Sequence, residues 1–269
     1  MAGQKDVAAL RGKRQGAQMI DFWLYPALTA TAVLTGFIDA VAGGGGLIMM
    51  PALLFAGLPP HFALGTNKLQ SACGTAMATR NYHKAGLFEI RPNLPAVGVI
   101  FAGAAIGALL IQRFDAHVLN LLVPLLLMAV AIYTVLSPRM DDVESHAWLG
   151  KKGYLPVAGG IGFYDGFFGP GTGQFFATSL VGLRGLGLLR ATGLTKLFNL
   201  TSNIASILVF ALGGQVLWLL GLCMAAGAMA GAWLGSHTAA RFGAKVIRPL
   251  LVTVSLALTA KLVWSWFAG

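Results

Sequence analysis

The sequence predicts an all-α polytopic membrane protein made of two homologous repeats, with about eight spanning helices and short broken or re-entrant helices at glycine-rich motifs. The first observation behind this fold class is composition, because 57% of the 269 residues are hydrophobic and only 10% are charged. The mean hydropathy of +0.74 is too high for a soluble domain. The other two observations are apolar runs of membrane length and a glycine motif that occurs twice.

Several apolar runs approach the roughly 20 residues that cross a bilayer core. They cover residues 23–42, 93–112, 118–136, 215–234 and 247–267. The residues before the first run are polar and basic, and no cleavage site of small residues follows it, so the run is expected to remain as a helix. The expected units are a basic tail (1–22), a first transmembrane repeat (23–137), a polar linker (138–153) and a second transmembrane repeat (154–269).

The repeat is visible in two pairs of motifs. GFIDAVAGGGG (36–46) matches GFYDGFFGPGT (162–172), which aligns Asp39 with Asp165. Further along, GTNKL (65–69) matches GLTKL (193–197), which aligns Lys68 with Lys196. Each half is therefore expected to contain a spanning helix, a glycine break and a short apolar helix. A helix beginning at the Gly-x-x-Lys motif and two further spanning helices follow.

Loop charge favours an inverted arrangement of the two halves. The loop at 80–92 carries Arg80, Lys84 and Arg91, whereas its counterpart at 212–216 carries no charge. Since Lys and Arg concentrate in cytoplasmic loops, this opposite bias places equivalent loops on opposite faces. The basic tail argues against inversion, because inversion would place it outside, and its orientation stays open.

The glycine breaks mark a candidate binding site. Interrupted helices are costly in hydrocarbon unless the freed backbone groups lie inside the protein or line a cavity. Helix N-termini at such breaks carry unpaired N–H groups and partial positive charge, which suits a small anion. The alternative is that the glycines only allow close helix packing.

Lys68 and Lys196 are ionisable residues at membrane depth and hence functional candidates. Alternatively they snorkel to the interface, or form internal salt bridges with Asp39 and Asp165. The two aspartates either carry a coupling proton or hold a lysine, and the sequence leaves both open. The expected substrate-binding residues are Gly43, Gly44, Gly45, Gly46, Thr66, Asn67, Lys68, Gln70, Gly169, Gly171, Thr172, Gly173, Gln174, Thr195, Lys196 and Asn199.

Other classes of site and function have little support. The net charge of +10 comes mainly from loops and the basic tail, where Lys and Arg set topology and meet anionic lipid, so nucleic acid is not an expected partner. Cys73 and Cys223 lie in unmatched apolar segments, and no histidine has metal-ligand spacing. No nucleophile and base pair is present, so neither catalysis, a metal nor a cofactor is expected.

The stretch GFIDAVAGGGGLIMMPALLFAGLPPHFALGTNKLQ resembles the first repeat signature of the TauE/SafE family of sulfite and organosulfonate exporters, in its YfcA-like branch. GFYDGFFGPGTGQFF is similar to the family's second motif. The resemblance implies a multi-pass transporter of the bacterial inner membrane that handles sulfite, sulfoacetate or other organosulfonates.

The expected function is therefore a secondary transporter that exports such anions, coupled to protons through Asp39 or Asp165. The alternatives are an anion channel or a membrane-embedded interaction subunit without alternating access. A small anionic substrate and membrane lipid are the expected partners, and a homo-oligomer stays open.

Overall fold

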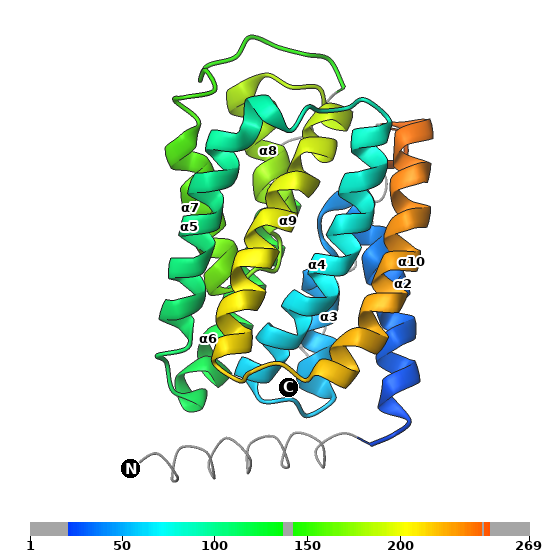
Figure 1. The fold of residues 1–269 in the computed structure, drawn as a ribbon, viewed down its shortest axis with the longest axis vertical. Helices are drawn as coiled ribbons and strands as arrows, with labels where there is room; N and C mark the ends of the chain where they lie inside the picture. Colours follow the sequence, from blue (N-terminus) through cyan, green and yellow to red (C-terminus); the bar gives the residue numbers. More distant parts are fainter. Residues whose placement is uncertain (1–20, 137–141, 244, 248–269) are drawn as a thin grey trace.

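The computed structural model describes residues 21–136, 142–243 and 245–247. The expectations for most of the basic tail and for the apolar run 247–267 therefore lie outside the described residues. All regular structure in the described part is helical (Figure 1). The helices are α2 (Leu24–Ala42), α3 (Gly45–Phe55), α4 (Pro60–Lys84), the 3-10 turn η1 (Arg91–Asn93), α5 (Leu94–Ile111), α6 (Ala116–Leu136), α7 (Leu155–Phe167), α8 (Thr172–Arg184), α9 (Leu188–Leu212) and α10 (Trp218–Phe242).

The long helices form two sets that run in opposite directions. In the first set α10 packs along α2 and α4. Helices α2 and α10 run parallel: Gly227 packs against Thr29, and Gly235, eight residues later, packs against Phe37, also eight residues later. In the second set, α7 packs along α5 and both contact α9.

The helices α4 and α9 meet in the middle and are antiparallel (Figure 1). Gly65, near the start of α4, lies against the carbonyl of Gln215 just beyond the end of α9. Gly193, near the start of α9, lies against Leu87 just beyond the end of α4. Residues from both halves of the chain are thereby brought together along the centre of the molecule.

Close packing within each set depends on small residues. A Cβ atom at Gly227 or Gly231 would clash with backbone carbonyl oxygens of α2. A Cβ at Gly103 or Gly107 would clash in the same way with α7. Small residues that let helix backbones approach are typical of membrane interfaces, where lipid tails provide no hydrophobic driving force between helices.

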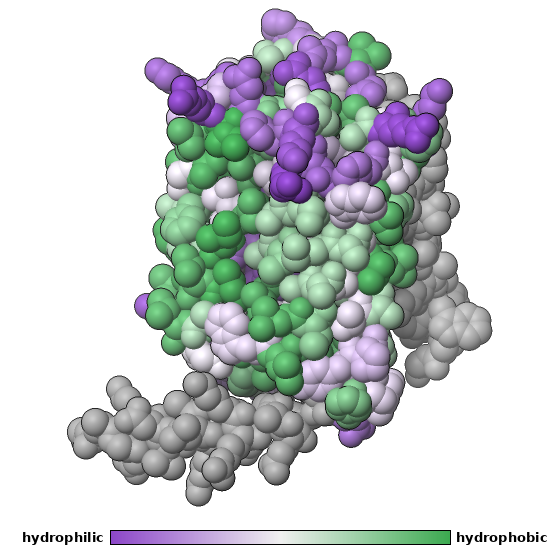
Figure 2. Space-filling view, turned by 45° about the vertical axis from the view of Figure 1, so that its right-hand side comes forward, coloured by the Kyte–Doolittle hydropathy of each residue, from purple (hydrophilic) through white to green (hydrophobic). Residues whose placement is uncertain are grey.

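Four segments of the described chain are long and apolar enough to cross a membrane: α2, η1 with α5 (Arg91–Ile111), α9 and α10. On the face that Figure 2 shows, the side of the molecule is largely hydrophobic and one end is strongly hydrophilic. The apolar runs 23–42 and 93–112, which the sequence predicts to span the membrane, coincide with α2 and α5. Helix α9 was not among the predicted apolar runs, because Thr and Asn residues interrupt its hydrophobic pattern.

The prediction that a helix begins at each Gly-x-x-Lys motif is wrong. Helix α4 begins at Pro60 and α9 at Leu188, so Lys68 and Lys196 each lie eight residues inside a helix of 25 residues. Pro60 starts α4 because proline lacks the N–H that a first helical residue leaves unpaired. Gly65 does not interrupt α4, and its missing side chain admits the backbone at Gln215.

Most basic residues of the described loops gather at one end of the molecule. Arg190 pairs with Glu144 there, and Lys151, Lys152 and Arg184 line one recess with Pro92. Arg113, which follows Gln112 at its contact with Gly213, lies at the other end near Asp115 in the sequence. The loop between α9 and α10, at the other end, carries no charge. The positive-inside rule therefore predicts that the basic end faces the cytoplasm.

Cysteine accessibility will test this orientation. We expect Ala85→Cys to react with a membrane-impermeant thiol reagent only from the cytoplasmic side, and Leu212→Cys only from the outer side, since both positions are exposed at opposite ends. Cys73 and Cys223 are partly buried and would be replaced first. Labelling of both introduced cysteines from the same side would contradict the arrangement.

Candidate functional site

The two glycine breaks touch each other at the centre of the molecule. Gly43 ends α2 in the left-handed conformation, with φ +75°, and Gly173 lies in the first turn of α8. A Cβ at Gly43 would lie 2.7 Å from the carbonyl carbon of Gly173, and a Cβ at Gly173 would lie 2.5 Å from the Cα of Gly43. Helices α3 and α8 therefore start close to one point, where the N–H groups of Thr172 and Gln174 already donate to the carbonyls of Gly169 and Gly171.

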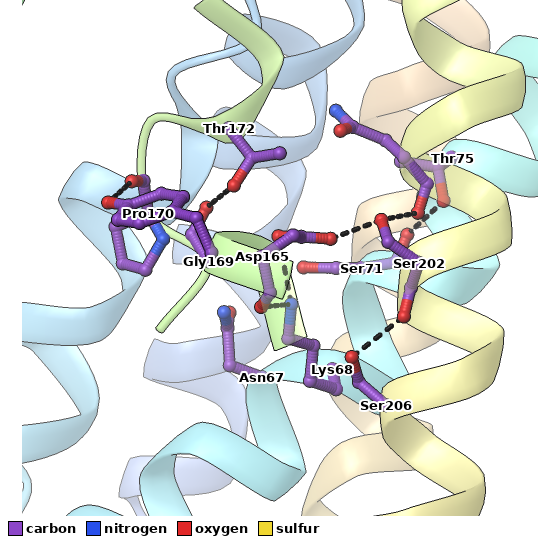
Figure 3. A network of polar contacts seen from close by, with 12 residues as sticks. Asn67, Lys68, Ser71, Thr75, Asp165, Gly169, Pro170, Thr172, Ser202 and Ser206 are labelled. Carbon is purple, nitrogen blue, oxygen red and sulfur yellow. Dashed lines mark hydrogen bonds and ion pairs between the residues drawn. The ribbon is translucent and has the colours of Figure 1, made fainter. Parts of the chain in front are cut away.

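Both lysines are buried beside the breaks and form ion pairs. Lys68 Nζ lies 2.9 Å from Asp165 Oδ1 and also donates to the backbone carbonyl of Asp165 (Figure 3). Lys196 Nζ lies 3.2 Å from Asp39 Oδ2 and donates to the backbone carbonyl of Asp39. The lysine side chains are only 2% and 0% exposed, so neither reaches the membrane interface.

The pairing is crossed between the halves of the chain. Lys68, on α4 in the first half, pairs with an aspartate on α7 in the second, and Lys196 on α9 pairs with an aspartate on α2. Each lysine therefore depends on the opposite glycine motif for its counter-ion. The four charges cancel, so the centre of the molecule has no net side-chain charge from these residues.

The two ion pairs differ in how completely the carboxylate is bound. Asp165 is 5% exposed in its side chain, and its second oxygen, Oδ2, accepts a hydrogen bond from the Ser202 hydroxyl (Figure 3). Asp39 is 26% exposed, and Lys196 is the only described side chain that bonds to it. Ser202 lies six residues after Lys196, and the position six residues after Lys68 is Gly74.

A recess of about 360 Å³, open solvent included, lies between the crossed pairs. Residues of both halves line it: Asp39, Gly43, Gly46, Asn67, Lys68, Ser71, Thr75, Asp165, Gly169, Gly171, Thr172, Gly173, Asn199 and Asn203. A second recess of about 270 Å³ shares Asp39, Gly46, Ser71 and Thr75 with it and adds Gly45 and Gln70. Asp39 therefore faces both recesses, whereas Asp165 faces only the first.

Two buried polar atoms at the site lack a hydrogen-bond partner within the described part of the chain. They are Asn199 Oδ1 in the central recess and Thr195 Oγ1, which lies beside Lys196 in a third recess of about 220 Å³. Buried polar atoms in proteins are nearly always hydrogen-bonded. Unpartnered atoms next to lysines are consistent with a site that a small polar ligand completes.

Some of the predicted binding residues lie elsewhere. Thr66 accepts a hydrogen bond from the backbone N–H of Leu217 and so connects α4 to the start of α10. Gly44 is the N-cap of α3, and Gln174 is buried in α8 outside the described recesses. Conversely, Ser71 and Thr75 line the site without having been predicted. They follow Lys68 by three and seven residues, the spacing of one helix face, which is the signal that could have found them.

Within the described residues no group of His, Cys, Asp and Glu side chains could hold a metal ion. The site therefore consists of two lysines, two aspartates, side-chain amides and hydroxyls, and helix N-termini. Such a set can bind a small oxyanion through charge and several N–H and O–H donors.

Comparison with known proteins identifies the family. The model of the sulfite exporter TauE/SafE family matches residues 28–262. The chain belongs to this family. Its TauE/SafE relatives include a "Probable membrane transporter protein ORF9" of a Sinorhizobium species, which is 46% identical over 91% of this chain and 94% of the relative.

Two further TauE/SafE relatives agree. The "Probable membrane transporter protein YfcA" of Escherichia coli K12 is 40% identical over 91% of this chain and 92% of the relative. A "Probable membrane transporter protein" of Haemophilus influenzae is 41% identical over 89% of this chain and 95% of the relative. No solved structure matches the chain. The family and the apolar helices together make the chain a multi-pass membrane transporter.

Proposed function

We propose that the chain is a secondary transporter that exports small sulfur-containing oxyanions, such as sulfite or organosulfonates, across the bacterial inner membrane. The observation that carries this proposal is the recess between the crossed ion pairs. Lys68 and the starts of α3 and α8 line this recess, and the second buried lysine, Lys196, is paired with Asp39 at its wall; these groups favour a small anion. The sulfur chemistry and the outward direction come from the name of the family.

The proposal includes an inverted repeat with about eight spanning helices in the whole chain. The parallel set of α2, α4 and α10 and the opposite set of α5, α7 and α9 support it, because α2 and α7 are the first helices of the two halves. Alternating access would follow from movement of one half against the other around the recess. The crossed ion pairs join the moving parts at their centre.

Flux measurements on reconstituted protein test this function. Vesicles with the transporter should take up sulfite or methanesulfonate with saturation, and the uptake should accelerate when the same anion is present on the opposite side. Replacing Lys196 with Gln removes a charged donor, and such donors are worth about 1.5–3 kcal/mol, so uptake should fall roughly tenfold or more.

Arg190→Gln is the matched control, because it also removes a cation but lies at an exposed ion pair with Glu144. Its flux should equal that of the unmodified protein. Flux that rises linearly with concentration and lacks counter-transport would identify a channel instead. Absence of flux for every sulfur oxyanion tested would refute the proposal.

A further inference from the structure

We infer that Asp39, and not Asp165, takes up the coupling proton, and that proton and anion bind together because both act on Lys196. This inference rests on the proposed transport function and names the residue that couples it. The two aspartates occupy matching places in the glycine motifs, so the difference between them must come from their surroundings.

Both carboxylate oxygens of Asp165 already accept a hydrogen bond. Lys68 binds Oδ1, and the Ser202 hydroxyl binds Oδ2 in a position almost closed to solvent. A proton on this carboxylate would remove the negative charge that both donors bind. A hydroxyl that donates to a carboxylate favours its charged form.

The surroundings of Asp39 are open on one side. The residue that corresponds to Ser202 is Gly74, which has no side chain to donate a hydrogen bond. Gly74 instead lines the second recess together with Asp39 and Thr35. One carboxylate oxygen of Asp39 binds Lys196, and the side chain keeps 26% of its surface exposed. Water can therefore deliver a proton to Asp39 without breaking a bond to a hydroxyl.

No other described titratable group competes for this proton at the recess. From α9 only Lys196 faces Asp39, and from α4 the Tyr82 hydroxyl lies nearby and donates to the carbonyl of Ala40. Lys68 and Asp165 lie across the central recess and are paired.

The remaining helices that contact α2 add no titratable group there. Helix α3 contains none, and the titratable residue of α8 is Arg184 at its far end. In α10, Gly227 packs against Thr29 of α2, which lies ten residues before Asp39. Cys223 precedes Gly227 in this parallel pair, so it lies well over two helical turns from the level of Asp39. His237 lies two residues after Gly235 and so near the level of Asp39, but it is exposed and its ring contacts Asn81, while Arg241 lies in the last turn.

Charge balance links the proton to the anion. With both pairs formed the site is neutral, so a bound monoanion would leave one uncompensated negative charge at membrane depth, which is costly. A proton that moves from water to a carboxylate oxygen of Asp39 neutralises it and frees the Lys196 ammonium for the oxyanion. When the anion leaves, the proton returns to water and the ion pair forms again.

The two ligands therefore travel in the same direction. An exported anion would carry a proton outward, so its own concentration gradient, and not the inward proton gradient, would drive export. The sequence predicts export driven by the proton gradient, so the direction of coupling differs. The difference arises because the Asp39 carboxylate and the transported anion compete for the Lys196 ammonium.

Paired substitutions in vesicles test the assignment. With methanesulfonate as the probe, the unmodified protein should carry more flux at acidic pH and should move protons with the anion, as read by an internal pH dye. In Asp39→Asn, whatever anion exchange remains should have lost both its pH dependence and the proton movement. Asp165→Asn should keep the pH dependence of whatever flux remains, and loss of it there but not in Asp39→Asn would overturn the assignment.

A second pair of variants avoids substitution of a charged residue. Gly74→Ser adds the missing hydroxyl beside Asp39, and a Cβ there would lie 3.3 Å from the Cβ of Ala228, a close but usable position. It should move the pH profile of transport toward acid. Ser202→Ala should leave the midpoint of the profile in place. An unchanged profile in Gly74→Ser would contradict the inference.

Infrared difference spectroscopy separates this inference from the proposed function. Acidification of the unmodified protein should produce a protonated carboxyl band that is absent from Asp39→Asn and present in Asp165→Asn. If that band behaves as expected while no sulfur anion is transported, the transport proposal fails and the assignment to Asp39 stands. A band that persists in Asp39→Asn refutes the assignment whatever the transport result.

Discussion

Lys68→Ala is expected to destabilise the protein by roughly 3–5 kcal/mol, the cost of removing one partner from a buried ion pair. The substitution leaves Asp165 with the Ser202 hydroxyl as its remaining side-chain partner in a position almost closed to solvent. Lys196→Ala should cost less, because the carboxylate of Asp39 keeps contact with solvent. Unfolding by SDS in mixed micelles would measure both.

The double variant Lys68→Ala with Asp165→Ala provides the control. Removing both charges avoids an unpaired buried charge, so the double variant should be more stable than Lys68→Ala alone. Arg190→Ala, at an exposed ion pair, should change stability by no more than about 1 kcal/mol. If Lys68→Ala destabilises no more than Arg190→Ala does, the buried pair is not a structural element.

Gly173→Ala is the second substitution with a large expected effect. Its methyl group would lie 2.5 Å from the Cα of Gly43, so the two glycine breaks would have to separate. Overpacking of this kind costs about 1–3 kcal/mol, and here backbone atoms cannot move aside as a flexible side chain can. We expect transport to be lost or to fall at least tenfold, measured as anion flux per folded protein.

Gly182→Ala is the matched control in the same helix, since nothing lies within 4 Å of the point that an added Cβ would occupy. It should preserve flux, because alanine is a better helix former than glycine. Equal flux in both variants would indicate that the contact between the breaks has no part in transport.

The sequence was informative where a chemical pattern occurs twice. The paired Asp39 and Asp165 motifs and the paired lysines located the centre of the molecule, because ionisable residues and glycine breaks are costly in an apolar chain. The helix class and the membrane location followed from composition together with apolar runs of membrane length.

Other features depend on tertiary contacts that one repeat cannot reveal. The crossed pairing of Lys68 with Asp165 requires the two halves to be packed together. The difference between the aspartates depends on Ser202 and Gly74, which lie one helical turn and more from the lysines and are informative only when the facing helix is known. The Gly-x-x-Lys motif predicted that α4 begins at the glycine, whereas the helix begins at Pro60. Gly65 is accommodated inside the helix because the facing backbone packs against it.

The crossed ion pairs also bear on how the chain is made. During synthesis, Lys68 reaches the membrane about a hundred residues before its partner Asp165. The sequence separation between Asp39 and its partner Lys196 is larger still. Neither half contains the native partner of its own buried lysine or aspartate. The first half should therefore remain open to water or to an insertion chaperone until the second arrives, and separately expressed halves should be degraded unless both are produced in the same cell.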